Sequence, residues 1–355
     1  MRLSAGVLLV TLLVLHGATA AELEFVPLGN LRGADDFGKR SQAYGVSRDG
    51  VAVVGESLSS VGLGVTRGAE AFLWVAPGPL RGLDALSPPE TQYFSAAYDV
   101  SDQGRVVVGQ SQTGQGRQAF RWTAETGMVA LGAPANRESS VAYGVSADGQ
   151  IIVGSRGRTA FRWTAEQGLT PLDGAQRSAA LAVSSDGQVV VGWRHVTAGT
   201  EAFRWTADGG MQGLGDLPGD SYLSGANDVS RDGSVIVGTG TSDRGTEAFR
   251  WTADTGLVPL GDLPDGEFSS SAHAVSGDGR VVVGRAAGPT GPEAFLWTAE
   301  QGIQSLTALV HSVPEAAQWQ LTEARDISDD ATIIVGFGIN HEKETAAWLI
   351  RRPKP

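Results

Sequence analysis

The decapeptide EAFRWTADGG spans Glu201–Gly210, and the nearly identical EAFRWTADTG spans Glu247–Gly256. Their starts lie 46 residues apart. Phe and Trp stand two positions apart in each copy, so both side chains lie on one face of a β-strand. The segment occurs seven times, and its tryptophans are Trp74, Trp122, Trp163, Trp205, Trp251, Trp297 and Trp348. A segment repeated over the whole chain predicts one structural unit built seven times.

A second segment, A-x-x-V-S-x-D-G-x-V-V-V-G, precedes each copy of the first. It starts at Ala43, Ala97, Ala142, Ala180, Ala226, Ala272 and, in a degraded form, Ala324. Ser and Asp side chains bond nearby backbone N–H groups and Gly tolerates positive φ, so S-x-D-G predicts a turn. The run V-V-V does not alternate apolar with polar residues, and this is typical of strands buried on both faces. Each unit therefore predicts four short strands: A-x-x-V-S, V-V-V-G, A-F-R-W-T and a last one such as G-L-V-P-L-G.

Proline marks the fourth strand as the outer edge of each sheet. Pro27, Pro171 and Pro259 fall inside this strand, and Pro cannot donate to a ladder. The first strand carries mostly small residues two positions after its Ala, which suits the crowded inner end of radially packed sheets. These residues are Gly45, Asp99, Gly144, Ala182, Asp228, Ala274 and Asp326.

The two ends of the chain complement each other. The seventh unit stops at LIRRPKP, soon after Trp348, and so lacks its fourth strand. FVPLGNL, from Phe25, matches LVPLGDL, from Leu257, and can supply the missing strand. A ring closed in this way leaves no open end. We expect one domain over residues 21–355, an all-β, seven-bladed β-propeller of four-stranded blades. A linear solenoid would need polar capping units, and none is present.

The first twenty residues have the features of a secretory signal peptide. Arg2 is followed by the apolar run VLLVTLLVL and by small residues ending at Ala20, the expected cleavage site. We expect export to the periplasm or the extracellular medium, with no membrane insertion once residues 1–20 are removed; an uncleaved anchor is the alternative. The chain has no Cys, so an exported fold must be stabilised by packing without disulfides.

Charge limits the classes of partner. The 27 basic and 39 acidic residues give a net charge of −12, which repels phosphate backbones and anionic membranes. We therefore expect no nucleic-acid partner. We expect a monomer that binds a glycan or a protein.

The repeat resembles the bacterial extracellular HAF repeat family. That family's unit has a Trp-containing strand after His-Ala-Phe, then Leu-Gly-x-Leu, a Ser-Ala stretch and a V-V-G strand. This chain has EAFRW, LGDLPGD, SGANDVS and VIVG in that order, and the resemblance covers all seven units. It implies export and a repeat fold, and it brings no catalytic residues. In place of the family's His stand Glu70, Gln118, Thr159, Glu201, Glu247, Glu293 and Glu344.

Loop lengths distinguish the two faces of the expected ring. The turns between strands one and two, and between three and four, keep one length. The other two sets of connections vary, and both emerge on one face, which we call the variable face. Binding residues are expected there, on loops held by a rigid scaffold. The candidate ligand-binding residues are Tyr93, Phe94, Trp193, His195, Tyr222, Phe268 and Trp319. The alternative is that these aromatics fold back against their own loops.

The glutamates before A-F admit two interpretations. Ring closure would arrange Glu70, Glu201, Glu247, Glu293 and Glu344 in a circle that attracts a cation or a basic ligand. We favour a structural role, either solubility at the strand start or pairing with a neighbour's Arg121, Arg162, Arg204 or Arg250. The S-x-D-G aspartates are likewise interpreted as turn formers, because further carboxylates at alternating positions are missing.

Signals for catalysis are weak. There is no H-E-x-x-H, G-x-S-x-G or P-loop motif and no Cys nucleophile, so we name no catalytic residue, metal ligand or cofactor. Our first hypothesis is a non-catalytic exported binding or scaffold propeller. The alternatives are a secreted polysaccharide hydrolase or lyase and a purely structural surface protein. A deep pocket holding two or three carboxylates, or a His with a carboxylate, would favour the enzyme.

Overall fold

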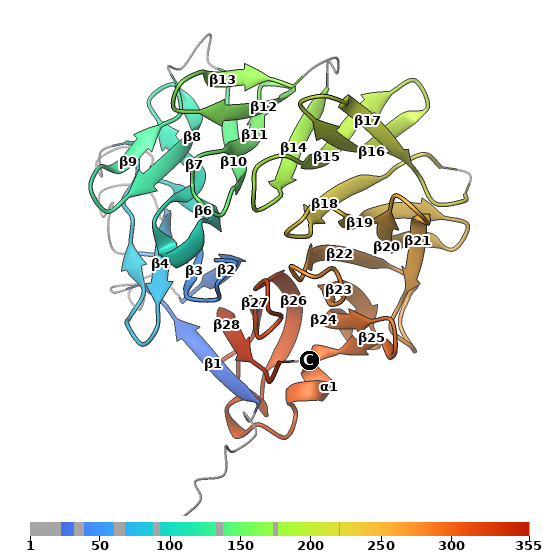
Figure 1. Cartoon of the computed structure of the whole chain (residues 1–355). Coiled ribbons are helices and arrows are strands. Elements are labelled where there is room, and N and C mark those ends of the chain that lie inside the picture. The colour runs from blue at the N-terminus through green and yellow to red at the C-terminus, as the bar shows by residue number, and fades with distance from the viewer. Residues whose placement is uncertain are drawn as a thin grey trace, which may run out of the picture.

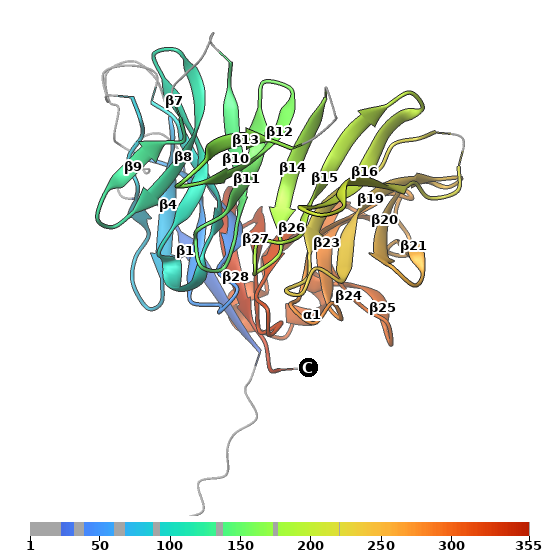
Figure 2. The same cartoon turned by 45° about the horizontal axis from the view of Figure 1, so that its top comes forward.

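The computed structural model describes residues 23–31, 39–59, 68–87, 93–132, 138–172, 177–219 and 221–354. They form seven four-stranded sheets arranged around a central axis, with the first strand of each sheet innermost (Figures 1 and 2). The predicted seven-bladed β-propeller is thereby confirmed. The predicted signal peptide, residues 1–20, lies outside the described residues.

The first four blades follow the order of the chain. Blade 1 contains β2 (Ser41–Val46), β3 (Ala52–Leu58), β4 (Ala69–Val75) and β5 (Arg81–Gly82). Blade 2 contains β6 (Ser95–Val100), β7 (Val107–Thr113), β8 (Gly116–Thr123) and β9 (Gly127–Ala130). Blade 3 contains β10 (Ser140–Val145), β11 (Ile152–Arg156), β12 (Thr159–Thr164) and β13 (Gly168–Pro171). Blade 4 contains β14 (Ser178–Val183), β15 (Val190–Val196), β16 (Gly199–Thr206) and β17 (Gly210–Gly215).

The last three blades complete the ring. Blade 5 contains β18 (Gly225–Val229), β19 (Val235–Ser242), β20 (Gly245–Thr252) and β21 (Gly256–Gly261). Blade 6 contains β22 (Ser270–Val275), β23 (Val282–Gly288), β24 (Gly291–Thr298) and β25 (Gly302–Ser305). Blade 7 takes three strands from the end of the chain and one from its beginning: β26 (Gln320–Ile327), β27 (Ile333–Ile339), β28 (Thr345–Arg351) and β1 (Glu24–Gly29).

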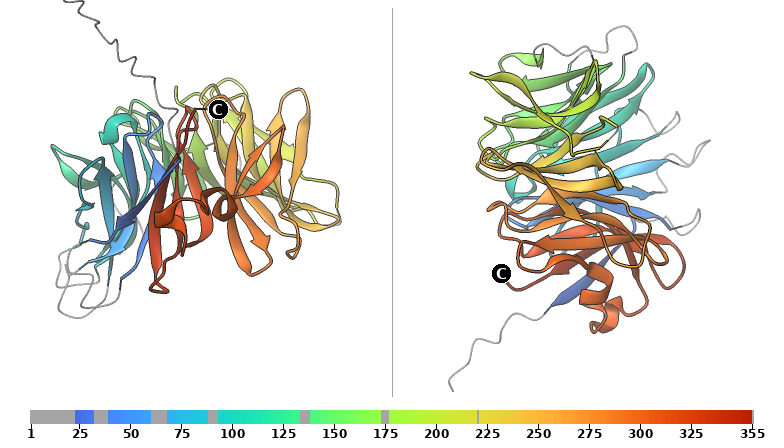
Figure 3. Two further views of the ribbon diagram at one scale, coloured as in Figure 1. Left: turned by 90° about the horizontal axis from the view of Figure 1, so that it is seen from below. Right: turned by 90° about the vertical axis from the view of Figure 1, so that its right-hand side faces the viewer.

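Pairing of β1 with β28 closes the propeller. The two strands are antiparallel, with Phe25 opposite Ile350 and Pro27 opposite Trp348. Figure 3 shows blue β1 lying against the red strands of the C-terminal end. Phe25 is 3% exposed and shares a core cluster with Trp348. The beginning and end of the chain thus lie in one sheet, as the sequence predicts.

The roles predicted for the individual strands are also observed. β1, β13 and β21 are edge strands, so Pro27, Pro171 and Pro259 need not donate a ladder bond on the outer side. The V-V-V strands are buried on both faces and supply apolar side chains to two neighbouring blades. Val54 of β3, for example, packs with Val107 and Phe120 of blade 2. Burial between adjacent blades is therefore the main source of packing energy.

The S-x-D-G turns form as the sequence predicts. The Ser47 hydroxyl donates to Asp49 at 2.6 Å and accepts from the Ala52 N–H at 2.9 Å. Five other turns repeat the Ser–Asp bond. In blade 2 the turn is the 3-10 segment η2 (Asp102–Gly104), in which Gln103 takes a φ of 59°.

The connection before blade 7 is a compact packed segment. It contains α1 (Leu306–Val310), capped by the Ser305 side chain, and η3 (Pro314–Ala316). Leu306, Val310 and Ala316 are buried in the same core cluster as Phe25. In the ranges that the structure describes, no helix has the length and apolar character of a membrane span.

Candidate functional site

A β-bulge in every innermost strand turns one side chain toward the axis. In blade 1, Ala43 pairs with Gly55 and Gly45 pairs with Val54, which leaves Tyr44 between them without a ladder partner. The same irregularity occurs in the six other blades. Such bulges re-aim side chains. The seven residues concerned line one cavity of about 490 Å³: Tyr44, Tyr98, Tyr143, Leu181, Asn227, His273 and Arg325.

We call this cavity the vestibule. Thr239 and Ser271 line its end on the variable face, and Arg48 lies at its opposite, inner end. Its volume falls within the range typical of ligand sites, roughly 300–1,000 Å³. Close packing of the inner strands explains why the cavity is narrow, because a Cβ on Gly45 would stand 2.7 Å from the Tyr98 carbonyl oxygen. At Gly45 and Gly144 the approach of the neighbouring blade therefore leaves little space for a Cβ, whereas the other five blades carry Ala or Asp at this position.

One wall of the vestibule is aromatic. The rings of Tyr44 and Tyr98 lie 5.6 Å apart, and those of Tyr98 and Tyr143 lie 5.8 Å apart, so three consecutive blades form an aromatic arc. The Tyr44 hydroxyl donates to Gln42 at 2.9 Å, and the Tyr98 hydroxyl accepts from Gln110. Burial, with the nearby Glu56, raises the pKa of Tyr98 to about 12. The hydroxyls are held by neighbouring polar side chains and stay protonated at neutral pH.

The opposite wall is polar. Asn227 donates from Nδ2 to the Ala272 carbonyl at 2.8 Å, which leaves its side-chain oxygen as a potential acceptor. The hydroxyls of Thr239 and Ser271 are hydrogen-bonded to each other. Hydroxyl and amide groups of this kind can donate or accept with a ligand that enters between the two walls.

His273 is a neutral imidazole on the polar wall. Its Nδ1 lies 3.0 Å from the Ala324 carbonyl oxygen, which can only accept, so Nδ1 carries the proton. Burial, reinforced by the positive charge of Arg325, lowers the pKa of His273 to about 4. The Nε2 atom therefore keeps its lone pair at neutral pH and can accept a hydrogen bond or a proton.

Arg325 joins the two walls. Its guanidinium donates to Glu323 at 2.7 Å and lies over the Tyr44 ring, 5.6 Å from the centroid. Its Nε is buried and has no hydrogen-bond partner among the described residues. The cation thus stacks against one end of the aromatic arc.

Three aspartates at the inner end of the vestibule connect neighbouring blades. Asp99 accepts the Val145 N–H at 2.8 Å, Asp228 accepts that of Val275 at 2.9 Å, and Asp326 accepts that of Val46 at 2.8 Å. Asp99 and Asp326 also bond the backbone N–H of the next residue in the chain. The recurrence of Asp in the repeat therefore has a structural cause, and the same carboxyls line the cavity.

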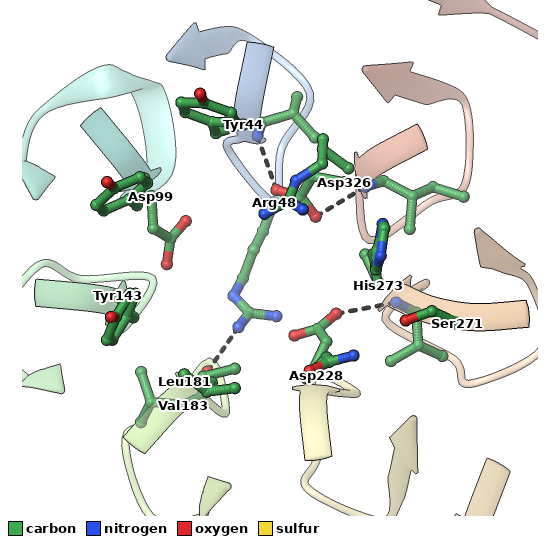
Figure 4. Close-up of a pocket in the computed structure, with 18 of the residues that line it drawn as sticks. Tyr44, Arg48, Asp99, Tyr143, Leu181, Val183, Asp228, Ser271, His273 and Asp326 are labelled. Carbon is green, nitrogen blue, oxygen red and sulfur yellow. Dashed lines mark hydrogen bonds between the residues drawn. The ribbon is translucent and has the colours of Figure 1, made fainter. Parts of the chain in front are cut away.

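Arg48 lies among these aspartates (Figure 4). Its side chain crosses the channel from blade 1 and donates to the Val183 carbonyl of blade 4 at 2.7 Å. Burial works to lower the pKa of Arg48, but the carboxyls of Asp228, Asp329 and Asp99 raise it above the usual value. We call Arg48 and the three aspartates the floor of the vestibule.

The floor has three carboxyl groups and one guanidinium, and burial disfavours the charged form of each carboxyl. Burial raises the pKa of Asp99 to about 7 and that of Asp228 to about 6, although Arg48 pulls both down. The pKa of Asp326 is also raised well above its ordinary value, first by burial and then by Asp228 and Asp99. One guanidinium does not compensate three buried carboxylates, so the cluster holds protons near neutral pH.

The predicted loop aromatics lie elsewhere. None of the seven candidates lines the vestibule. Tyr93 is 3% exposed, and Tyr222 donates its hydroxyl to Glu201 at 2.9 Å. Phe94 is covered by Arg117, and Phe268 by Arg244. These contacts agree with the alternative in which the aromatics fold back, while their ligand-binding role stays a prediction.

Trp319 and Trp193 have different surroundings. The Trp319 ring packs edge-on against Phe25 at 5.2 Å between centroids, so it helps to hold the closing strand β1. Trp193 directly follows V-V-G in blade 4, and Thr239 occupies the equivalent position in blade 5. The Trp193 side chain lies beside Gly225 of blade 5. It is therefore close to the level of the vestibule mouth. His195, two residues further on, is exposed.

The glutamates before A-F are used within their own blades. Glu201 pairs with Arg194 at 2.8 Å, Glu70 accepts the Asp84 N–H at 3.2 Å, and Glu293 bonds the Ser305 hydroxyl. The structural interpretation therefore holds for these three, with partners other than the predicted arginines. Over the residues described, no group of three or more His, Cys, Asp or Glu side chains could hold a metal ion.

The sequence contains a signal for the vestibule that the repeat pattern conceals. The first x of A-x-x-V-S varies as Tyr, Tyr, Tyr, Leu, Asn, His and Arg, whereas the flanking Ala and Val hardly change. When one position varies inside an otherwise repeated strand, each blade of a symmetric scaffold can place a different functional group at that position. The bulge that turns this position inward is a backbone feature, which the residue pattern alone does not reveal.

Comparison with known proteins shows the fold and no family. No protein-family model matches the chain, and no curated protein matches it. An oligogalacturonate lyase in complex with manganese matches with a TM-score of 0.55 and 12% identity, over 88% of each chain. TolB from Acinetobacter baumannii gives 0.48 and 12%, over 72% of this chain and 63% of that one. A putative TolB from Agrobacterium tumefaciens gives 0.44 and 16%, over 61% and 74%.

Proposed function

We propose that this protein is an exported, non-catalytic binding module, and that a glycan enters its vestibule from the variable face. The observation that carries the proposal is the aromatic arc of Tyr44, Tyr98 and Tyr143 facing a polar wall across one cavity. Sugar rings have apolar faces that stack on aromatic rings and hydroxyl edges that need hydrogen-bond partners. The predicted signal peptide supports export, and the HAF resemblance stays a prediction.

A glycan array probed with the purified protein tests this function. We expect binding to a subset of glycans, and we expect Tyr143→Ala to weaken it at least tenfold because one stacking surface is lost. Phe268→Ala is the matched control, since Phe268 packs under Arg244 on a loop away from the vestibule. Loss of binding in the Phe268 variant with full binding in the Tyr143 variant would move the site to the loop aromatics. An array without signal would contradict glycan binding.

A polysaccharide hydrolase or lyase is the second candidate. A pocket with several carboxyls and a His would favour such an enzyme, and in this structure three carboxyls and a neutral His273 line the same cavity. With its proton on Nδ1, His273 has a lone pair on Nε2, as a general base requires. The carboxyls are less suited to catalysis, because each already accepts a backbone N–H from the next blade. Release of reducing ends or of an unsaturated product from an array-positive glycan, abolished by His273→Gln, would establish this alternative.

A further inference from the structure

The channel is narrowed by backbone hydrogen bonds at the end opposite the variable face. The x residues of the S-x-D-G turns lie there, and six of the seven donate their N–H to the carbonyl of the next blade's turn. Six such bonds of 2.9 to 3.2 Å run from Asp102 of blade 2 round to Arg48 of blade 1. The turns are thus joined into an almost complete ring.

This ring leaves little space at its centre. Seven backbone segments linked by hydrogen bonds at the usual spacing of about 4.8 Å form a ring about 11 Å across. The thickness of the backbone itself reduces the free width to roughly 7 Å, because non-bonded carbon atoms approach no closer than about 3.5 Å. Arg48, Arg231 and Asp329 place their side chains in this space.

Arg48 is the side chain that closes the opening from within. It spans the channel to the Val183 carbonyl and also pairs with Asp329 at 3.5 Å. Asp329 in turn pairs with Arg231 at 3.7 Å, across the same opening. These contacts connect blades 1, 4, 5 and 7, so the inner end of the vestibule is a floor and not a passage.

We propose that the vestibule binds the end of a glycan chain through a neutral terminal unit, and that Arg48 sets how deep this unit enters. This inference rests on the proposed function, which it makes more specific. A chain bound by an internal segment needs two exits, and within the described part of the chain the turns and Arg48 obstruct the end opposite the variable face. A cavity of about 490 Å³ also accommodates a short terminal part of a chain and no long segment.

The floor also specifies the chemistry of the end unit. Asp99, Asp228 and Asp326 lie around the guanidinium of Arg48, and the second guanidinium of the vestibule, that of Arg325, is already paired with Glu323. A ligand carboxylate placed there would face three carboxyl groups and so be repelled or forced to carry a proton. Hydroxyl groups can instead donate to the carboxyl oxygens and accept from the guanidinium. A uronate end is therefore expected to bind more weakly than its neutral counterpart.

The experiment is an array of glycans printed through their reducing ends, with related chains that differ by one added terminal sugar. For every glycan that binds, we expect extension of the free end by one different unit to reduce the signal at least tenfold. Replacing the neutral end unit by its uronate should reduce it as well. Changes of sugar further along the chain should leave binding nearly unchanged.

Three outcomes decide the matter. Signals that follow the terminal unit support chain-end binding. If the array signal depends on an internal motif and not on the terminal sugar, this inference is overturned while the proposed glycan function stands. An array without any signal overturns both.

A variant that fills the vestibule gives an independent measurement. Leu181→Trp enlarges a half-buried side chain that lines the cavity, and we expect it to abolish array binding. Leu223→Trp is the control, since Leu223 is 58% exposed on a loop. Equal melting temperatures establish that both variants fold; if Leu181→Trp does not fold, the array on the native sequence decides alone. Undiminished binding by a folded Leu181→Trp variant overturns the proposal.

Discussion

Asp99 holds two blades together and faces the vestibule at the same time. Its carboxylate accepts backbone N–H groups from Val145 and Val100, and Arg48 lies nearby. Blades 1, 3, 4 and 6 have Gly45, Gly144, Ala182 and Ala274 at this position. Only the three other blades therefore have a carboxyl that can bond the backbone of the next blade. One residue thereby contributes to blade docking and to the polarity of the site.

The raised pKa of Asp99 makes stability depend on pH. Its folded-state value is about 7, whereas an unperturbed Asp titrates near 4. The stability contributed by the protonated carboxyl is fully present below the unfolded value and is lost as the pH rises through about 7. We expect the free energy of unfolding in urea to fall by about 1 kcal/mol between about pH 6.5 and about pH 8.5 on account of Asp99.

Asp99→Asn tests this dependence, because the amide keeps an acceptor for the Val145 N–H and does not titrate. The difference between the two pH values should shrink by that amount in the variant. The lowered pKa of His273, about 4, acts in the opposite direction, up to about one pH unit above its ordinary value of about 6.5. His273 is unchanged in Asp99→Asn, so its contribution cancels when the two proteins are compared. An unchanged pH dependence in Asp99→Asn would refute the assignment.

At this scale the sequence predicted positions better than contacts. It placed Asp99, Asp228 and Asp326 on the inner strand, and there each carboxyl accepts a backbone N–H from the next blade. It could not show that Arg48, in a turn common to all blades, reaches across the channel to Val183. That contact joins residues 135 positions apart and depends on closure of the whole ring.

The closing strand β1 is the element on which the ring depends. It pairs with β28, and its Phe25 is buried between blade 7 and the segment that contains α1 and η3. Trp319, predicted from its loop position to bind a ligand, packs edge-on against Phe25. This contact links the start of the chain to the last connection before blade 7.

A double-mutant cycle measures how the two rings hold β1. Phe25→Ala should lower the free energy of unfolding by about 3–5 kcal/mol, because a fully packed aromatic side chain is lost. Trp319→Ala should cost less, since its ring is only partly buried. The coupling between the two should be about 1 kcal/mol, as for other edge-to-face aromatic pairs.

Phe268→Ala provides the control for this cycle. Phe268 packs under Arg244 on another blade, so its effect should add to that of Phe25→Ala without coupling. Additive effects of Phe25→Ala and Trp319→Ala, with no coupling, would mean that Trp319 does not secure the closing strand.

Strands were the most predictable elements, and the connections were the least. Repetition fixed the four strands of each blade, and the prolines fixed the outer edge, because backbone hydrogen bonding restricts Pro in the same way in every copy. The short β5 and the packed segment between β25 and β26 occur once each, so no repeat could predict them. The bulges occur in all seven blades, but they are changes of backbone pairing that leave the residue pattern unaltered. The repeat therefore could not reveal them either.

For the whole molecule, a sevenfold scaffold surrounds a vestibule without sevenfold symmetry. The scaffold repeats Ala, Val, Ser and Trp positions, while the inward residues divide into an aromatic wall on blades 1 to 3 and a polar wall on blades 5 to 7. The rigid ring keeps these walls at fixed separation, which limits the entropy lost when a ligand binds between them.

A crystal structure of the protein with an array-positive glycan tests the central claim most directly. We predict that the terminal sugar lies between the aromatic arc of Tyr44, Tyr98 and Tyr143 and the polar wall of Asn227 and His273. The rest of the chain should leave through the variable face, and Arg48 should remain bonded to Val183 beneath the sugar. A glycan bound on the loops near Phe94 or Phe268, with the vestibule free of sugar, would contradict the account.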